Sequence, residues 1–310
     1  VTVIDKGAVG HGCSYGNAGW LVPAHAMPLP APGAVRSAAK WIMRPDSPLY
    51  IKPRCSPAMA RWLLRFLRSS NKGSFERGIP PLVGLAQRSL ELTEAFVADH
   101  GNDGLDFRMN GLTYVCKSRA GLDHSLHELD LVRKLGYDGE VLDAEALVHR
   151  EPIIRGPVAG GVFYPGQGQI APLPFVKSLA AQAAALGATF LPGTEVFEFE
   201  IDGRRIRSVH TTQGSIEADE IVLAAGAWTR DISKKIGVEA PIEAGKGYAL
   251  IYDQPEQMPT APLLLGEGRV AITPRNGSIR CAGTMELGGM NDSISPRRVL
   301  AIALTTTEYM

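Results

Sequence analysis

Residues Val1–Pro23 read VTVIDKGAVGHGCSYGNAGWLVP, and this stretch decides the fold. It opens with an apolar, β-branched run, Val1–Ile4, which ends in an acid, Asp5, and a glycine-rich segment follows over residues 7–19. A buried strand that ends in a carboxylate and leads into a glycine loop is how a dinucleotide-binding fold binds a ribose. The stretch therefore predicts a strand and loop of a dinucleotide-binding domain.

The order of the glycines decides which strand this is. Residues 7–12 have the pattern G-x-x-G-x-G and follow the acid, whereas the phosphate loop is G-x-G-x-x-G and precedes the acid by about 20 residues. We therefore interpret Asp5 as the ribose-binding acid at the end of a second strand. The first strand and its phosphate loop are expected to lie outside this sequence, in agreement with the lack of Met at position 1. We expect truncation also after Met310.

Composition narrows the class of protein. The 310 residues predict about two domains. The charge is balanced and the pI is 7.2, which argues against a nucleic-acid partner held by a basic surface. No apolar run approaches the roughly 18 residues that a spanning helix needs. The scattered cysteines, with no C-x-x-C and no histidine at metal spacing, predict reduced thiols in an intracellular, cytoplasmic protein and no metal site.

A helix with a basic face is expected over residues 58–70, after a proline-rich connection over 22–57 that holds a short helix around Ala34–Met43. Its apolar side chains are Trp62, Leu63, Phe66 and Leu67, and its arginines are Arg61, Arg65 and Arg68. Two interpretations stay open. The helix packs its apolar side inward, or it rests on the anionic inner face of the cytoplasmic membrane.

A second helix is expected over Pro81–His100. Its buried face is predicted to consist of Leu82, Leu85, Leu90, Leu92 and Phe96.

The rest of the chain alternates between strands and helices. Strands are expected at Leu105–Cys116, Gly161–Tyr164, Thr189–Leu191, Val196–Ile201, Ser208–Thr212, Tyr248–Tyr252, Val270–Pro274 and Ile279–Gly283. Helices are expected at His124–Leu135, Leu173–Leu186, Thr229–Ile236 and from about Pro296. The apolar run Ile221–Ala225 predicts a further strand, buried on both faces.

No hydrolytic motif is present: the sequence lacks G-x-S-x-G, H-E-x-x-H and a P-loop lysine. His25 is a weak candidate because it lies near the glycine segment, although a lone histidine is more often structural. Three glycine-bearing turns stand out, at 16–19, 224–228 and 245–248. Together they favour a large cofactor that lies across them.

Several pieces, in order, carry a resemblance to a known family. They are VTVIDK at 1–6, CSYGNAG at 13–19, the APG and KW pieces within 31–41, AAGAWT at 224–229, GKGY at 245–248 and TPRNGSIRCAGTMEL at 273–287. Over nearly its whole length the chain resembles the FAD-dependent D-amino-acid dehydrogenases and their glycine and D-amino-acid oxidase relatives, the DAO family.

The resemblance implies FAD as cofactor and a set of residues that bind it. These are Asp5, Lys6, Ser14, Asn17, Ala18, Gly19, Val196, Ala225, Gly226 and Trp228. Asp5 stands where an acid binds the adenosine ribose, and the loop through Asn17 and Gly19 stands where pyrophosphate, ribityl chain and flavin ring lie. Tyr248 matches the strand that faces the substrate, and Lys246 is assigned to substrate binding with it.

The fold implied is α/β: a partial Rossmann-like FAD-binding domain with an inserted antiparallel-sheet substrate domain. We expect the FAD-binding domain over 1–102 and 166–240, and the substrate domain over 103–165 and 241–310. The family's C-terminal glycine-rich segment and substrate-carboxylate arginine lie outside the matched pieces. Arg275 and Arg280 are near, but the resemblance assigns neither of them this role.

The implied reaction is oxidation of a D-amino acid, or a related imino acid of D-proline type, by hydride transfer from the α-carbon to flavin N5. No protein residue is assigned as catalytic. The expected electron acceptor is a membrane quinone, and an oxidase that uses O2 is the alternative. An alternative of another class is a non-catalytic remnant that folds without holding FAD.

Overall fold

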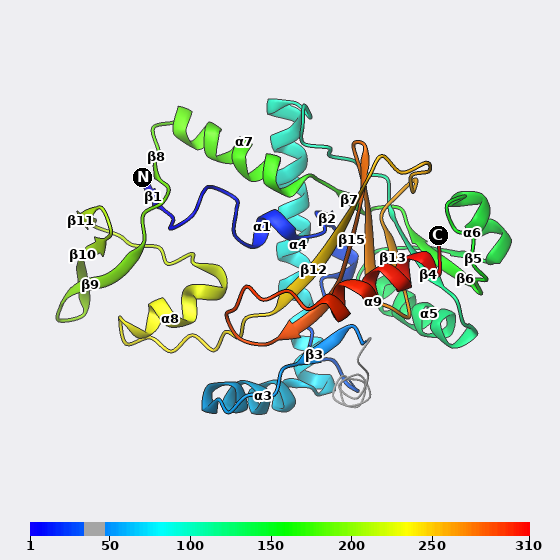
Figure 1. The fold of residues 1–310 in the computed structure, drawn as a ribbon, viewed down its shortest axis with the longest axis horizontal. Helices are drawn as coiled ribbons and strands as arrows, with labels where there is room; N and C mark the ends of the chain where they lie inside the picture. The colour runs from blue at the N-terminus through cyan, green and yellow to red at the C-terminus, as the bar shows by residue number, and fades with distance from the viewer. Residues whose placement is uncertain (34–46) are drawn as a thin grey trace. The chain divides into compact units, whose positions relative to one another are not determined.

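The computed structural model describes residues 1–33 and 47–310, so the helix expected around Ala34–Met43 lies outside the described residues. The chain divides into two compact units, which are described separately (Figure 1). Unit 1 comprises Val1–Gly16, Pro57–Trp62 and Pro172–Ala244; unit 2 comprises Asn17–Ser56, Leu63–Ala171 and Gly245–Met310. The assignment of residues 1–102 and 166–240 to an FAD-binding domain and of 103–165 and 241–310 to a substrate domain stays a prediction.

Unit 1 is built around a parallel strand pair. β1 (Thr2–Ile4) pairs with β8 (Thr189–Leu191), which follows α7 (Pro172–Ala185) after the left-handed Gly187, φ 95°. The loop after β1 lies against α7: Gly10 has φ 79°, and a Cβ there would come within 2.8 Å of Leu173. The left-handed backbone and the close approach to α7 both favour glycine at this position. The expected helix and strand of this region are confirmed.

The remaining elements of unit 1 are short. They are α1 (Cys13–Gly16), the antiparallel strands β9 (Val196–Asp202), β10 (Arg205–Thr211) and β11 (Gly214–Glu217), the 3-10 turn η2 (Gly226–Trp228) and α8 (Thr229–Lys234).

Two burial expectations in unit 1 are wrong. Ile221–Ala225 forms no strand, and Val222 is 87% exposed. The opening strand is not buried either, since Val3 is 39% exposed. Both segments have the apolar composition of inner strands, but a strand is buried on both faces only inside a covered sheet. Among the described residues β1 has β8 as its one strand partner, and 221–225 has none.

Unit 2 contains an eight-stranded mixed sheet in the order β12-β15-β14-β13-β4-β6-β5, with β3 paired to β15. Its strands are β3 (Leu49–Ile51), β4 (Leu112–Cys116), β5 (Glu140–Leu142), β6 (Gly160–Tyr164), β12 (Lys246–Asp253), β13 (Leu263–Leu265), β14 (Val270–Arg275) and β15 (Ser278–Leu287). Most pairs are antiparallel, and β13–β4 and β15–β3 are parallel. A separate antiparallel pair joins β2 (Trp20–Leu21) to β7 (Gly168–Gln169).

Two local expectations for this sheet need correction. The strand expected over Leu105–Cys116 begins only at Leu112, because Gly111 adopts φ 87°. Within residues 245–248, which were expected as a turn, residues 246–248 are instead the beginning of β12.

The two faces of the sheet differ in what covers them. Cys281, Ile272 and Leu263 pack with Ile302 of α9 (Pro296–Thr307), and we call this side the α9 face; α9 crosses it in Figure 1. Tyr114, Tyr164 and Leu264 pack on the other side with Leu129 of α5 (Arg119–Lys134) and with Ala24 of the 3-10 turn η1 (Pro23–His25). We call this second side the loop face. α6 (Ala144–Arg150) completes the unit.

Register places charged residues on the loop face. Ala271 pairs with Leu264 of that face, so Thr273 and Arg275, two and four residues further along β14, point the same way. Arg280 is the cross-strand partner of Thr273 and shares its side.

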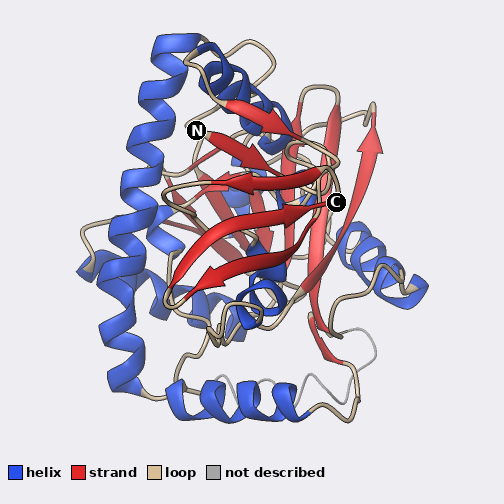
Figure 2. Cartoon of the chain, turned by 90° about the vertical axis from the view of Figure 1, so that its left-hand side faces the viewer, coloured by secondary structure: helices blue, strands red, loops and turns tan. Residues whose placement is uncertain are grey.

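The basic helix is confirmed as α3 (Pro57–Ser69). The second helix, α4 (Lys72–His100), is longer than expected and is the tallest helix in Figure 2; Asn71 caps it by accepting from Ser74 N, and Pro80 and Pro81 lie inside it. Its predicted buried face is wrong at three positions, since Leu82, Leu85 and Leu92 are 40%, 71% and 54% exposed. Leu90 is buried as predicted, and the other buried residues of the helix are Ile79 and Thr93. Across the described ranges, no helix combines the length and apolar character needed to span a bilayer.

Candidate functional site

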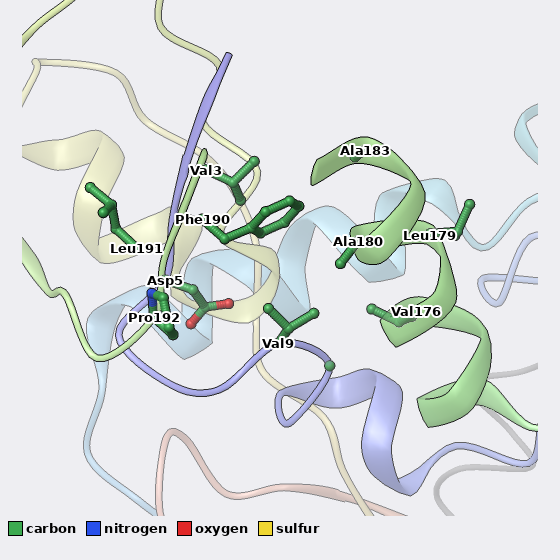
Figure 3. A pocket seen from close by; sticks show the side chains of 11 residues that line it. Val3, Asp5, Val9, Val176, Leu179, Ala180, Ala183, Phe190, Leu191 and Pro192 are labelled. Atoms are coloured by element: carbon green, nitrogen blue, oxygen red, sulfur yellow. The ribbon is translucent and has the colours of Figure 1, made fainter. Parts of the chain in front are cut away.

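Asp5 lies at the edge of a pocket in unit 1. The pocket has a volume of about 340 Å³ and apolar walls from β1, the following loop, α7 and β8 (Figure 3). Val9, Val176 and Phe190 are among its lining residues, and Asp5 is the one charged residue in its lining. The arrangement suits a flat apolar ring system that carries a hydroxylated group.

Backbone contacts fix the position of Asp5. Its N–H donates to Leu191 O at 3.2 Å, and its carbonyl accepts from Thr194 N at 2.9 Å, so the chain on both sides of the carboxylate is held by β8 and the turn after it. Oδ1 accepts from Gly7 N at 2.8 Å. An acid at the carboxyl end of a parallel strand is thus oriented by the glycine loop that follows it.

The other expected cofactor residues of unit 1 are dispersed over several of its elements. Lys6 Nζ lies 4.5 Å from the centroid of the Trp228 ring, so these two residues are together. Gly226, φ 52°, begins η2, and Ala225 precedes it. Val196 begins β9, and Ser14 lies in α1.

In unit 2, residues 17–20 form a loop fastened to the sheet. Asn17 Oδ1 accepts from Gly19 N at 2.8 Å, and Gly19 is buried with φ 77°. The Thr273 hydroxyl accepts from Trp20 Nε1 at 2.9 Å and donates to Ala18 O at 3.0 Å. Asn17, Ala18 and Gly19 are therefore brought together on the loop face.

Lys246 and Tyr248 are adjacent on the α9 side of the sheet, where they meet a buried carboxylate. Tyr248 OH donates to Glu286 Oε2 at 2.6 Å, and Lys246 Nζ lies 3.3 Å from Glu286 Oε1. Burial, followed by the hydrogen bond to Glu286, raises the pKa of Tyr248. Lys246 also donates to Asn291 Oδ1 at 2.7 Å and to Ser293 O at 2.6 Å, and so holds the segment after β15.

His25 is held between two tyrosines of the loop face. Its ring stacks on Tyr114 at 4.8 Å and meets the edge of Tyr164 at 4.5 Å, and Nδ1 lies 3.0 Å from Tyr114 OH. Burial, followed by the charge of Arg269, lowers the pKa of His25 to about 4. The imidazole is neutral at pH 7 and serves as a packed ring.

Sequence analysis did not single out Glu286, because it lies on β15, the strand that pairs with the strand of the GKGY motif. It also did not distinguish the burial of Arg275 from that of other arginines, since this burial depends on the pairing of β14 with β15. Among the described residues no cluster of three His, Cys, Asp or Glu side chains could hold a metal ion.

A parallel strand that ends in an oriented acid and leads into a glycine loop is typical of dinucleotide-binding folds. A family model described as "FAD dependent oxidoreductase" (DAO) matches residues 1–310. The chain belongs to this DAO family, as the sequence predicted, and FAD is its cofactor.

Curated relatives agree with this assignment. The D-amino acid dehydrogenase of Cereibacter sphaeroides is 30% identical over 99% of this chain and 72% of its own length. The D-amino acid dehydrogenase of Agrobacterium fabrum is 30% identical over 98% of this chain and 74% of its own.

Solved structures share the fold. Glycine oxidase from Geobacillus kaustophilus aligns with a TM-score of 0.73 at 20% identity, over 100% of this chain and 71% of its own. Glycine oxidase from Bacillus cereus aligns with a TM-score of 0.67 at 24% identity, over 74% of this chain and 64% of its own. The expected α/β class is confirmed.

The residues present fit one end of FAD. Adenosine offers a flat base for the apolar walls formed by Val9, Val176 and Phe190, and ribose hydroxyls for the Asp5 carboxylate. Gly7 N–H donates to one oxygen of Asp5, Oδ1, and a carboxylate accepts several hydrogen bonds.

Proposed function

We propose that this chain binds FAD and oxidises a D-amino acid, or a related imino acid of D-proline type, with electrons passed to a quinone-type acceptor. The observation that supports this most is the oriented carboxylate of Asp5 beside an apolar pocket in a DAO-family chain. FAD, when bound, supplies the two-electron chemistry. The residues of the protein bind the cofactor, orient the substrate and shield both from water.

The proposed cofactor contacts fall into two groups. In unit 1, Asp5 accepts from the ribose, with Lys6, Ser14, Val196, Ala225, Gly226 and Trp228 as further contacts. In unit 2, the loop Asn17–Gly19 presents backbone groups to the cofactor. We propose that unit 1 is mainly the FAD-binding part and that unit 2 contributes the substrate-binding sheet.

Substrate contact by Tyr248 and Lys246 stays a prediction. Their hydrogen bonds to Glu286 and to the segment around Asn291 support a positioning role as well, because they fix the end of β15. The matched test compares Lys246→Met with Lys234→Met, a lysine exposed on α8. A rise in KM for a D-amino acid in the first variant alone supports substrate contact.

The experiment that tests the proposed function begins with reconstitution. The chain is titrated with FAD while flavin fluorescence is followed, and a panel of D-amino acids is then tested with an artificial electron acceptor. We expect Asp5→Ala to weaken FAD binding roughly 10- to 100-fold, because a hydrogen bond to a charged group contributes about 1.5–3 kcal/mol. The control is Asp219→Ala, an exposed acid of unit 1.

Two outcomes separate the alternatives. Oxygen consumption with peroxide release during turnover favours the oxidase, an activity that the names of the glycine oxidase structures also suggest. A chain that stays colourless after reconstitution favours the non-catalytic remnant and overturns the proposal.

For a quinone-type acceptor we propose peripheral contact of α3 with the inner face of the cytoplasmic membrane. Leu64 and Leu67 are 52% and 47% exposed, and the exposed arginines 61, 65 and 68 lie beside them at helical spacing. Co-sedimentation with anionic vesicles should fall several-fold in a Leu64→Ser, Leu67→Ser variant. The matched control is Leu85→Ser, Leu92→Ser on α4, and equal binding by both variants contradicts the contact.

A further inference from the structure

The loop of residues 17–19 is fixed to unit 2 through two successive carbonyl groups. Ile170 N donates to Gly19 O at 2.8 Å. The Thr273 hydroxyl donates to Ala18 O at 3.0 Å. Gly19 is buried, whereas the first residue of the loop is exposed. A loop whose backbone is held in place before a ligand arrives loses less conformational entropy when the ligand binds.

The Thr273 hydroxyl has a choice of directions for its hydrogen. A hydroxyl has one donor and two acceptor lone pairs, and its hydrogen rotates to suit the neighbouring groups. Trp20 Nε1 donates to this oxygen at 2.9 Å, so the hydroxyl hydrogen is directed away from the indole. The acceptor that remains for it is Ala18 O. The indole therefore favours the orientation in which the hydroxyl holds the loop.

The indole of Trp20 is itself held by the sheet unit. Its backbone forms β2 and pairs with Gln169 of β7. Its ring is partly buried and packs against the cluster of the loop face, which includes Tyr114 and Leu264. The direction of the indole N–H is therefore set by contacts outside the loop. Because hydrogen bonds in series polarise one another, the bond from the indole also strengthens the bond to the Ala18 carbonyl.

We propose that Trp20 is a positioning residue for the cofactor. It acts through the Thr273 hydroxyl to fix the Ala18 carbonyl, and with it the conformation of the loop that binds FAD. The series of hydrogen bonds from indole to hydroxyl to carbonyl is a feature of unit 2 itself, and we call it the indole relay. Only its purpose rests on the proposed function, in which residues 17–19 contact FAD.

The first measurement is hydrogen exchange in the chain without FAD. Trp20→Phe keeps a flat ring and removes the N–H donor. The Gly19 amide, which donates to Asn17 Oδ1, reports on opening of the loop. We expect this amide to exchange at least fivefold faster in Trp20→Phe, while the amides of α9 exchange as in wild type. The matched control is Trp62→Phe, which removes an indole N–H from α3 and should leave the exchange of the loop unchanged.

The second measurement is FAD binding, followed by flavin fluorescence. We expect Trp20→Phe to weaken FAD binding roughly three- to tenfold, as is typical for the loss of one hydrogen bond. Thr273→Ser keeps the hydroxyl and should retain both the affinity for FAD and the slow exchange of the loop. At saturating FAD, the KM of Trp20→Phe for the D-amino acid that wild type oxidises best should stay within about twofold of wild type, because the relay acts on the cofactor loop.

Three results would overturn the proposal. The first is unchanged exchange of the loop in Trp20→Phe, and the second is unchanged FAD affinity in this variant when wild type binds FAD. The third is exchange that rises equally in the loop and in α9, which indicates a general structural role of the indole.

Failure of the proposed function gives a different pattern. Wild type then does not bind FAD, while the exchange of the loop still rises in Trp20→Phe and not in Trp62→Phe. That pattern overturns the proposed function, and with it the cofactor purpose of the indole relay. The hydrogen bonds of the relay would nevertheless be supported by the exchange data.

Discussion

At the scale of single residues, His25 gives the clearest pH dependence. Its pKa is about 4 in the folded chain and 6.5 ordinarily, so the unfolded chain binds more protons between these values. The groups that face it are Tyr114 and Tyr164, with Arg269 as the charge that acts on it. The contribution of His25 to the unfolding free energy is fully present above pH 6.5 and is lost as the pH falls towards 4.

We therefore expect wild type to lose about 3 kcal/mol more unfolding free energy between pH 6.5 and pH 4 than His25→Phe, which keeps a packed ring. Urea unfolding across this range measures the difference. His127→Gln, at an exposed position of α5, is the matched control and should follow wild type. Parallel curves for wild type and His25→Phe would contradict a buried neutral imidazole.

Glu286 gives a second prediction at this scale. Its side chain is 5% exposed and accepts from Tyr248, so Tyr248→Phe and Glu286→Gln should each cost about 1–3 kcal/mol of unfolding free energy. The double variant should show coupling of about 1 kcal/mol, because the two residues share one hydrogen bond. Strict additivity in the double-mutant cycle would mean that the phenol and the carboxylate do not interact.

Residues differ in how far the sequence could predict them. The placement of Asp5 after a strand could be predicted because it depends on neighbours within a few positions, namely the strand before it and the glycine after it. Glu286 lies 38 positions from Tyr248, and Trp20 lies 253 from Thr273. Their pairing depends on strand register, which no local pattern contains.

At the scale of elements, β15 contains a bulge that can be tested. Its register with β12 shifts between Gly247 and Tyr248, and the extra residue on β15 is Thr284, with φ 55°. A β-branched residue in this left-handed region is strained. We expect Thr284→Gly to be neutral or stabilising by up to about 1 kcal/mol, although glycine normally weakens a strand.

The control for the bulge is Ala282→Gly in the same strand, where φ is not left-handed and glycine should destabilise. Thermal unfolding of both variants gives the comparison. A loss of stability in Thr284→Gly as large as in Ala282→Gly would argue against backbone strain at the bulge.

Elements with strong local signals were predictable: α7 ends at Ala185, shortly before the left-handed Gly187, and β14 and β15 have the expected strand composition. The errors occurred where burial depends on the neighbours of an element. The predicted buried face of α4 is correct at Leu90 and wrong at Leu82, Leu85 and Leu92, because the neighbours of the helix cover Ile79 and Thr93 instead. Ile221–Ala225 has the composition of an inner strand without a strand beside it among the described residues.

At the scale of the whole molecule, the division into two units predicts that substitutions in different units affect the unfolding free energy independently. Asp5 belongs to unit 1 and Glu286 to unit 2, and among the described residues they share no hydrogen-bond partner. The unfolding free-energy changes of Asp5→Ala and Glu286→Gln should therefore add within about 0.5 kcal/mol. Chemical unfolding of the two single variants and the double variant measures this, and a larger deviation would mean that the units are energetically coupled.

The Thr273 hydroxyl makes one strand position unusually intolerant of exchange. It accepts from an indole and donates to a carbonyl at the same time, so the position requires one donor and one acceptor on a short side chain. Only serine and threonine meet this requirement, and of the two only threonine also suits a strand interior. A saturation library at codon 273, sorted for folded protein, should therefore converge on these two amino acids and should reject valine, although valine has the shape of threonine. Because one hydroxyl joins the glycine loop to the sheet, a substitution at position 273 of the sheet also affects the loop.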